Sequence, residues 1–200
     1  MGHEVNLNII SVWKKFHIIK QTIDYDLLPS LNLRVQPKLG SPDWLIDSNN
    51  VERFINLTVS LINPGLFQMG LEMLRKLRQH ETTEEIAEEW QSVYNGISVI
   101  SNRITPAHRD GRGRQEWFDT LLNYSDEEAQ PRLLIKDLSL DLEYSSGTVV
   151  GFCGSIFQHE VLSWGDFDRV CYAHFMRESV RKRLDVPAAS WVHQNTYTSI

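Results

Sequence analysis

The stretch PAHRDGRGR, residues 106–114, places His108 and Asp110 two positions apart. In an extended segment such residues project to the same side, so both side chains can reach one ion. A second imidazole, His159, follows about 50 residues later. Two imidazoles and one carboxylate on one face of a metal leave its other positions open, which is the ligand set of non-haem Fe(II) oxygenases. The spacing therefore predicts an iron site held by His108, Asp110 and His159.

An arginine suited to a carboxylate follows this pattern. Arg169 stands ten residues after His159, and its guanidinium group can form two parallel hydrogen bonds to a carboxylate. Alternation along a strand puts Arg169, Cys171 and Phe175 on one face. We expect Arg169 to hold the far carboxylate of an oxoacid that binds the metal beside O2. Two alternatives stay open at this level: a His-x-Asp pair that is surface decoration without a metal, and a zinc ion in place of iron.

The elements that must position these residues change character along the chain. Residues 51–61 and 66–79 have a helical apolar period, whereas strand patterns begin at Gly96. A strand is predicted in each of GISVISNRIT, TLLNYS, RLLIKDL, LSLDLEY, TVVGFCGSIFQHEV and DFDRVCYAHFM, and a helix in ESVRKRL. The long segment TVVGFCGSIFQHEV is taken as one strand with bulges at Gly151 and Gly154. Helices followed by short strands predict an α+β fold, a β-sandwich or jelly roll with a helical layer.

Bulk composition limits the class of protein. The net charge of −6 argues against a protein that coats nucleic acid through overall charge. Charge is segregated, however, with basic clusters at 109–114 and 177–183 and acidic clusters at 81–89 and 126–128. No apolar run is long enough for a membrane span, so we expect no membrane partner. The two cysteines fit an intracellular, reducing compartment.

Four segments, GISVISNRITPAHRD, WFDTLL, GTVVGFCGSIFQHEV and DRVCYAHFMRESVRKRL, resemble the TET/JBP family of DNA-base dioxygenases, most closely the basidiomycete type. The resemblance covers about residues 90–187. It implies a double-stranded β-helix core, Fe(II), 2-oxoglutarate as co-substrate, and oxidation of a methyl group on a base of DNA, typically 5-methylcytosine. It also implies methylated DNA as the partner, with the base flipped out, and a nuclear location. We expect one domain over 1–200, with a mainly helical layer over 1–95 and the core over 96–187, in a monomeric protein.

The resemblance also assigns roles residue by residue. His108, Asp110 and His159 match the iron ligands, and Arg169 matches the arginine that binds 2-oxoglutarate. Relatives often carry a serine where this chain has Cys171, so that contact to the same carboxylate becomes weaker. The aromatic residue that stacks on the flipped base is matched by Phe175, for which core packing is the alternative.

Two base-reading positions differ from animal and amoeboid relatives. Arg177 replaces a histidine, and Gly113 replaces an asparagine or aspartate. Arg103 is expected to contact the co-substrate or a phosphate. The basic side chains beside the site are candidate phosphate contacts, with solvated surface charge as the alternative for each. These are Arg109, Arg112, Arg114, Lys182 and Arg183.

The two departures keep other functions open. One is an oxygenase of the same fold that acts on N6-methyladenine, an RNA base or a protein side chain. Another is a nucleic-acid-binding domain without catalysis, against which the complete ligand set argues.

Overall fold

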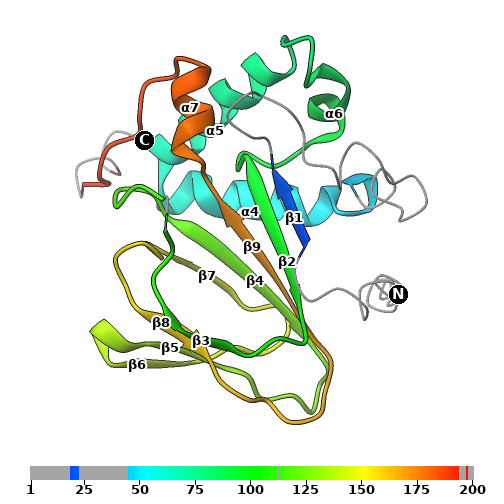
Figure 1. The fold of residues 1–200 in the computed structure, drawn as a ribbon, viewed down its shortest axis with the longest axis vertical. Helices are drawn as coiled ribbons and strands as arrows, with labels where there is room; N and C mark the ends of the chain where they lie inside the picture. Colours follow the sequence, from blue (N-terminus) through cyan, green and yellow to red (C-terminus); the bar gives the residue numbers. More distant parts are fainter. Residues whose placement is uncertain (1–18, 23–44, 112, 194–196, 198–200) are drawn as a thin grey trace.

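The computed structural model describes residues 19–22, 45–111, 113–193 and 197, and it has two facing sheets with helices against one of them (Figure 1). All neighbouring strands pair antiparallel. The larger sheet has the order β1 (Ile19–Thr22), β2 (Gly96–Ser101), β9 (Arg169–Phe175), β4 (Asp119–Ser125), β7 (Val149–Phe152). The smaller has the order β3 (Thr105–His108), β8 (His159–Val161), β5 (Arg132–Ile135), β6 (Leu140–Glu143). A 3-10 turn, Lys136–Leu138, links β5 to β6.

The helices cover the outer face of the larger sheet. They are α4 (Asn49–Ile62), α5 (Pro64–Leu77), α6 (Glu84–Glu89) and, after β9, α7 (Glu178–Arg183). The side chain of Asn63 caps α5, because its Oδ1 accepts a hydrogen bond of 3.0 Å from the Leu66 backbone, and Pro64 follows at the first helical position. The apolar stripes of α4 and α5 pack on the sheet, and this forms one of the two cores.

The second core lies between the two sheets. Alternation along β9 serves both cores, because Val170 packs on the helix side and Cys171 packs between the sheets. The predicted common face of Arg169, Cys171 and Phe175 is therefore the face that looks toward the smaller sheet. Residues placed on this face can meet residues from β3 and β8.

Two predicted strands are wrong in detail. Residues 148–161 form β7 and β8, which belong to different sheets, and the chain turns between them where the Ile156 and Phe157 amides donate to the Cys153 carbonyl. His159 therefore begins β8 instead of ending a long strand. The expected bulge at Gly151 is absent, since Gly151 pairs regularly with Thr120.

The predicted strand from Gly96 also divides into β2 and β3, with Asn102 between them in the left-handed region at φ 48°. Between residues 1 and 95, the described helices lie within 45–89, and the described strand β1 belongs to the larger sheet. The predicted α+β class with a double-stranded β-helix core is confirmed by two facing antiparallel sheets and helices on one face. None of the described helices combines the length and apolar character that crossing a membrane requires.

Candidate metal centre

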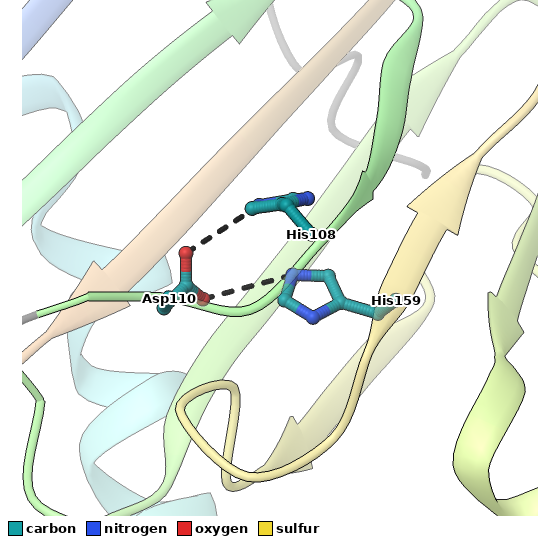
Figure 2. Close-up of side chains that lie close together, drawn as sticks. All are labelled: His108, Asp110 and His159. Carbon is teal, nitrogen blue, oxygen red and sulfur yellow. Dashed lines mark ion pairs between the residues drawn. The ribbon is translucent and has the colours of Figure 1, made fainter.

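The predicted ligands come together at the meeting point of β3 and β8. His108 ends β3 and His159 begins β8, and the two residues are partners in the strand register. Asp110 follows two residues after His108, and its carboxylate points between both rings (Figure 2). Asp110 Oδ1 lies 3.5 Å from His108 Nε2, and Asp110 Oδ2 lies 3.6 Å from His159 Nε2. One ligand atom from each residue lies within 4.8 Å of the others, which is the size of a site for one ion.

Backbone carbonyls fix the orientation of both imidazoles. His108 Nδ1 lies 2.9 Å from the Pro106 carbonyl oxygen, and His159 Nδ1 lies 3.0 Å from that of Phe157. A carbonyl only accepts, so each Nδ1 carries the proton and each Nε2 keeps a lone pair toward Asp110. Burial lowers the pKa of His159, which favours the neutral form that a metal requires.

The ligand cluster is enclosed on one side and open on the other. The His159 side chain is 6% exposed, whereas those of His108 and Asp110 are 38% and 43% exposed. Phe152 of β7 packs edge-on against the His159 ring at 4.9 Å. The protein therefore supplies ligands from one side only, and an ion held there keeps positions for other molecules.

A glycine makes room for the aspartate. The Asp110 amide donates to the Gly154 carbonyl at 2.9 Å. A Cβ on Gly154 would overlap Asp110 Oδ2 and would lie 2.7 Å from Asp119 Oδ2. The close approach of two carboxyl groups at this point requires a residue without a side chain. Burial and, second, the charge of Asp110 raise the pKa of Asp119 to about 8.

Arg169 supplies a cation to the inter-sheet space. Its side chain is 2% exposed, and its guanidinium lies 5.2 Å from the Tyr144 ring and 5.1 Å from the Trp164 ring. Nε and Nη1 of this group are buried without a hydrogen-bond partner among the described residues. A buried cation with unpaired donors is costly unless an anion joins it. The residues present therefore fit a carboxylate ligand at Arg169.

Cys171 lies beside this arginine in the same core. Its Sγ is 3.4 Å from the Tyr144 hydroxyl oxygen. Burial raises the pKa of Cys171 and raises that of Tyr144 well above its usual value, so both groups stay neutral. Neutral neighbours leave the charge of Arg169 available to an incoming anion.

The predicted substrate contacts take different positions. Phe175 and Arg177 lie together, with the guanidinium 5.8 Å from the ring centre. Arg103 is exposed in the segment between β2 and β3. Arg114 is already paired, at 2.7 Å with Glu116 and 3.4 Å with Glu178. Arg112 lies outside the described residues.

The other basic candidates differ in availability. Arg109 forms an ion pair of 3.0 Å with Asp137, which fixes it to the turn between β5 and β6. Lys182 lies 3.6 Å from Glu178, and Arg183 is exposed on α7. The described basic side chains beside the ligands therefore serve first as ties within the protein.

A groove of about 330 Å³ lies apart from the ligands, along the segment that joins β8 to β9. Trp164 lines it, and the same ring lies 5.1 Å from the Arg169 guanidinium. None of the three ligand residues lines this groove. The groove is therefore separate from the cluster of His108, Asp110 and His159.

Comparison with known proteins supports the fold. No protein-family model matches the chain, and no curated protein matches it. The solved structure of NgTET1 in complex with 5mC DNA is similar over 96% of this chain and 72% of that chain, with 13% identity and a TM-score of 0.63. At this identity the likeness establishes the shared fold.

Weaker likenesses carry no argument. A Pseudomonas putida prolyl-4-hydroxylase is 16% identical, with 86% of this chain and 92% of that chain covered and a TM-score of 0.40. A cupin 2 conserved barrel domain protein from Salinispora arenicola is 14% identical, with 45% and 69% covered and a TM-score of 0.32.

Proposed function

We propose that this chain is an Fe(II)- and 2-oxoglutarate-dependent dioxygenase that oxidises the methyl group of a base flipped out of DNA, 5-methylcytosine first. The observation that carries the proposal is the pairing of two features on one fold. A three-residue ligand cluster is open on one side, and a buried arginine in the same inter-sheet space lacks partners for two of its nitrogens. A 2-oxoacid with a distal carboxylate would satisfy both.

The residues have separate tasks in this proposal. His108, Asp110 and His159 would hold the iron, which with O2 and 2-oxoglutarate supplies the oxidant while 2-oxoglutarate becomes succinate and CO2. Arg169 would bind the far carboxylate of 2-oxoglutarate, which orients the co-substrate between the sheets. Phe152 and the inter-sheet core exclude water from the His159 side.

DNA is proposed as the substrate on two grounds. The sequence resembles base dioxygenases, and the NgTET1 structure of the same fold was solved with 5mC DNA. A base inside a duplex is out of reach of an enclosed metal, so the nucleotide would be flipped at a cost of a few kcal/mol. The half-buried Phe175 ring would offset part of that cost by stacking on the base. Action on DNA would place the protein in the nucleus, and all the ligands come from one chain, as a monomer requires.

N6-methyladenine is the second candidate substrate. Gly113 and Arg177 stand where relatives carry the residues that read cytosine. The base-binding site would therefore lack two contacts specific to that base. An N-methyl group is also open to hydroxylation, after which the product releases formaldehyde and leaves the amine. The same iron and co-substrate residues would serve both bases.

Nucleoside mass spectrometry tests the proposal. The protein is reconstituted with Fe(II) and 2-oxoglutarate without oxygen, and O2 is then added with DNA that carries 5-methylcytosine and N6-methyladenine. We expect hydroxymethylcytosine and succinate, both lost in His108→Ala. Loss of N6-methyladenine alone would select the second candidate. Succinate with every nucleoside unchanged would contradict a DNA substrate, and no succinate would contradict the dioxygenase itself.

A further inference from the structure

Asp119 is a carboxyl near the ligand cluster whose role the proposed function leaves open. It is the first residue of β4 and is half-buried. Leu121, two residues on, packs in the core between the sheets, whereas Leu122 packs on the helix side. By strand alternation the side chain of Asp119 therefore faces the space between the sheets, as the metal ligands do.

The strand register gives Asp119 two aromatic neighbours on that face. Asp119 is the partner of Phe152, whose ring packs on the His159 imidazole. On its other side, Thr120 is the partner of His174, so Asp119 lies next to Phe175 on β9. The carboxyl thus stands between the aromatic residue beside a metal ligand and the aromatic residue expected to stack on a base.

The surroundings of this carboxyl leave it free to bind something else. Its Oδ2 lies 2.7 Å from where a Cβ on Gly154 would be, the point that Asp110 Oδ2 also approaches. It accepts a hydrogen bond from the Gly154 amide. Among the described residues no lysine, arginine or histidine forms an ion pair with it. A half-buried carboxyl in this position is a polar group that points into the site without a cationic partner.

We propose that Asp119 is a substrate-positioning residue that hydrogen-bonds the Watson–Crick edge of the flipped base while Phe175 stacks on its face. This inference rests on the proposed function. Gly113 offers no side chain to a base, whereas Asp119 offers a carboxyl group from the start of β4. A carboxyl oxygen accepts hydrogen bonds, and the edges of cytosine and adenine each present an amino group that donates one.

The test is the coupling ratio, which is the amount of oxidised base formed per succinate released. A residue that holds the base at the metal changes this ratio. Product per succinate is measured for the wild type, Asp119→Ala and Asp119→Asn on DNA with 5-methylcytosine and with N6-methyladenine. We expect Asp119→Ala to lose about 10-fold or more of the coupling, because the base is no longer held at the metal. Asp119→Asn, which keeps an accepting oxygen on a side chain of the same length, should recover most of it.

Controls make the failures distinguishable. Asp141→Ala removes a carboxylate on β6 with a 59% exposed side chain, away from the ligands, and should couple like the wild type. Unchanged coupling in Asp119→Ala would overturn the positioning role, as would Asp119→Asn behaving like the alanine variant. Loss of Fe(II) binding by Asp119→Ala would assign the residue to metal support instead. A wild type that forms no succinate would mean that the proposed function itself has failed.

Discussion

The two faces of β9 bury charge in opposite ways. On the helix side, His174 is fully buried, and its Nε2 lies 2.9 Å from Glu52 Oε1 on α4. Its Nδ1 donates to the Thr120 carbonyl, so both ring nitrogens have acceptors. On the inner side, Arg169 is almost as buried, yet Nε and Nη1 have no partner among the described residues.

The presence or absence of a partner distinguishes a buried charge that stabilises the fold from one that awaits a ligand. A buried charge with partners joins two elements, in this case α4 and the larger sheet, and needs nothing from outside. A buried charge without partners costs free energy until a ligand supplies the anion. The face with the unpaired cation looks toward the smaller sheet, where His108, Asp110 and His159 meet, so a ligand between the sheets is the expected partner of Arg169.

The largest effect should come from the inner face. Asp110→Ala removes the carboxylate between both imidazoles, and we expect Fe(II) affinity to fall by more than about 100-fold. The Asp110 side chain is 43% exposed, so thermal stability of the metal-free protein should change little. Metal content after reconstitution and a melting curve measure both. A large loss of stability would break the comparison.

Removing the charge of Glu52 and removing that of Arg169 should change the free energy of unfolding in opposite directions. Glu52→Ala leaves the His174 imidazolium buried alone, and we expect the free energy of unfolding to fall by about 3 kcal/mol or more. Arg169→Leu removes an unpaired buried charge, so the same quantity should stay equal or rise by about 1 kcal/mol without ligand. Denaturant unfolding of both variants measures this. Equal destabilisation by the two changes would mean that Arg169 is structural.

Gly154 offers a finer test of the inner face. Gly154→Ala places a Cβ against the carboxylate of Asp110, and we expect metal affinity to fall about 10-fold as the ligand is displaced. Gly111→Ala is the matched control, because a Cβ there meets nothing within 4 Å. Metal titration of the two variants is the measurement. Equal affinities would show that the tight approach of Gly154 and Asp110 is not needed.

The helix-side pair predicts a smaller, pH-dependent effect. Although burial alone lowers the pKa of His174, the Glu52 carboxylate and the hydrogen bonds raise it overall. The stabilisation should therefore be complete below the unfolded pKa of about 6.5 and disappear as pH rises through the folded pKa. Melting temperature against pH should fall above neutrality in the wild type and less in His174→Gln. An equal fall of the melting temperature with pH in His174→Gln would show that the pair of His174 and Glu52 does not cause this pH dependence.

The meeting of His108, Asp110 and His159 could be predicted from the sequence because part of its signal is local. His108 and Asp110 are two residues apart in an extended segment, and Arg169 lies on a face set by alternation. The α+β class follows from periodicity in the same way. A residue whose placement depends only on its neighbours in the chain can be predicted from the spacing of residue types.

The missed features depend on contacts between distant segments. Residues 148–161 look like one strand because both flanks favour strand, and only the pairing of β7 and β8 with different sheets divides them. Tyr144 and Trp164 meet Arg169 from separate loops, so no spacing marks them. The sequence predicts that Arg114 is free to contact a phosphate. In the structure it pairs with Glu178 on α7, which is 64 residues away in sequence and 3.4 Å away in space.

Binding of 2-oxoglutarate tests the central claim most directly. Calorimetric titration without oxygen, in the presence of Fe(II), compares the wild type with Arg169→Met, which keeps an unbranched apolar stem and removes the charged guanidinium. We expect one 2-oxoglutarate per wild-type chain and a loss of affinity of about 100-fold in the variant, because two charge-assisted hydrogen bonds are removed. Equal affinity in both proteins, or no binding to the wild type, would contradict a co-substrate site at the buried arginine.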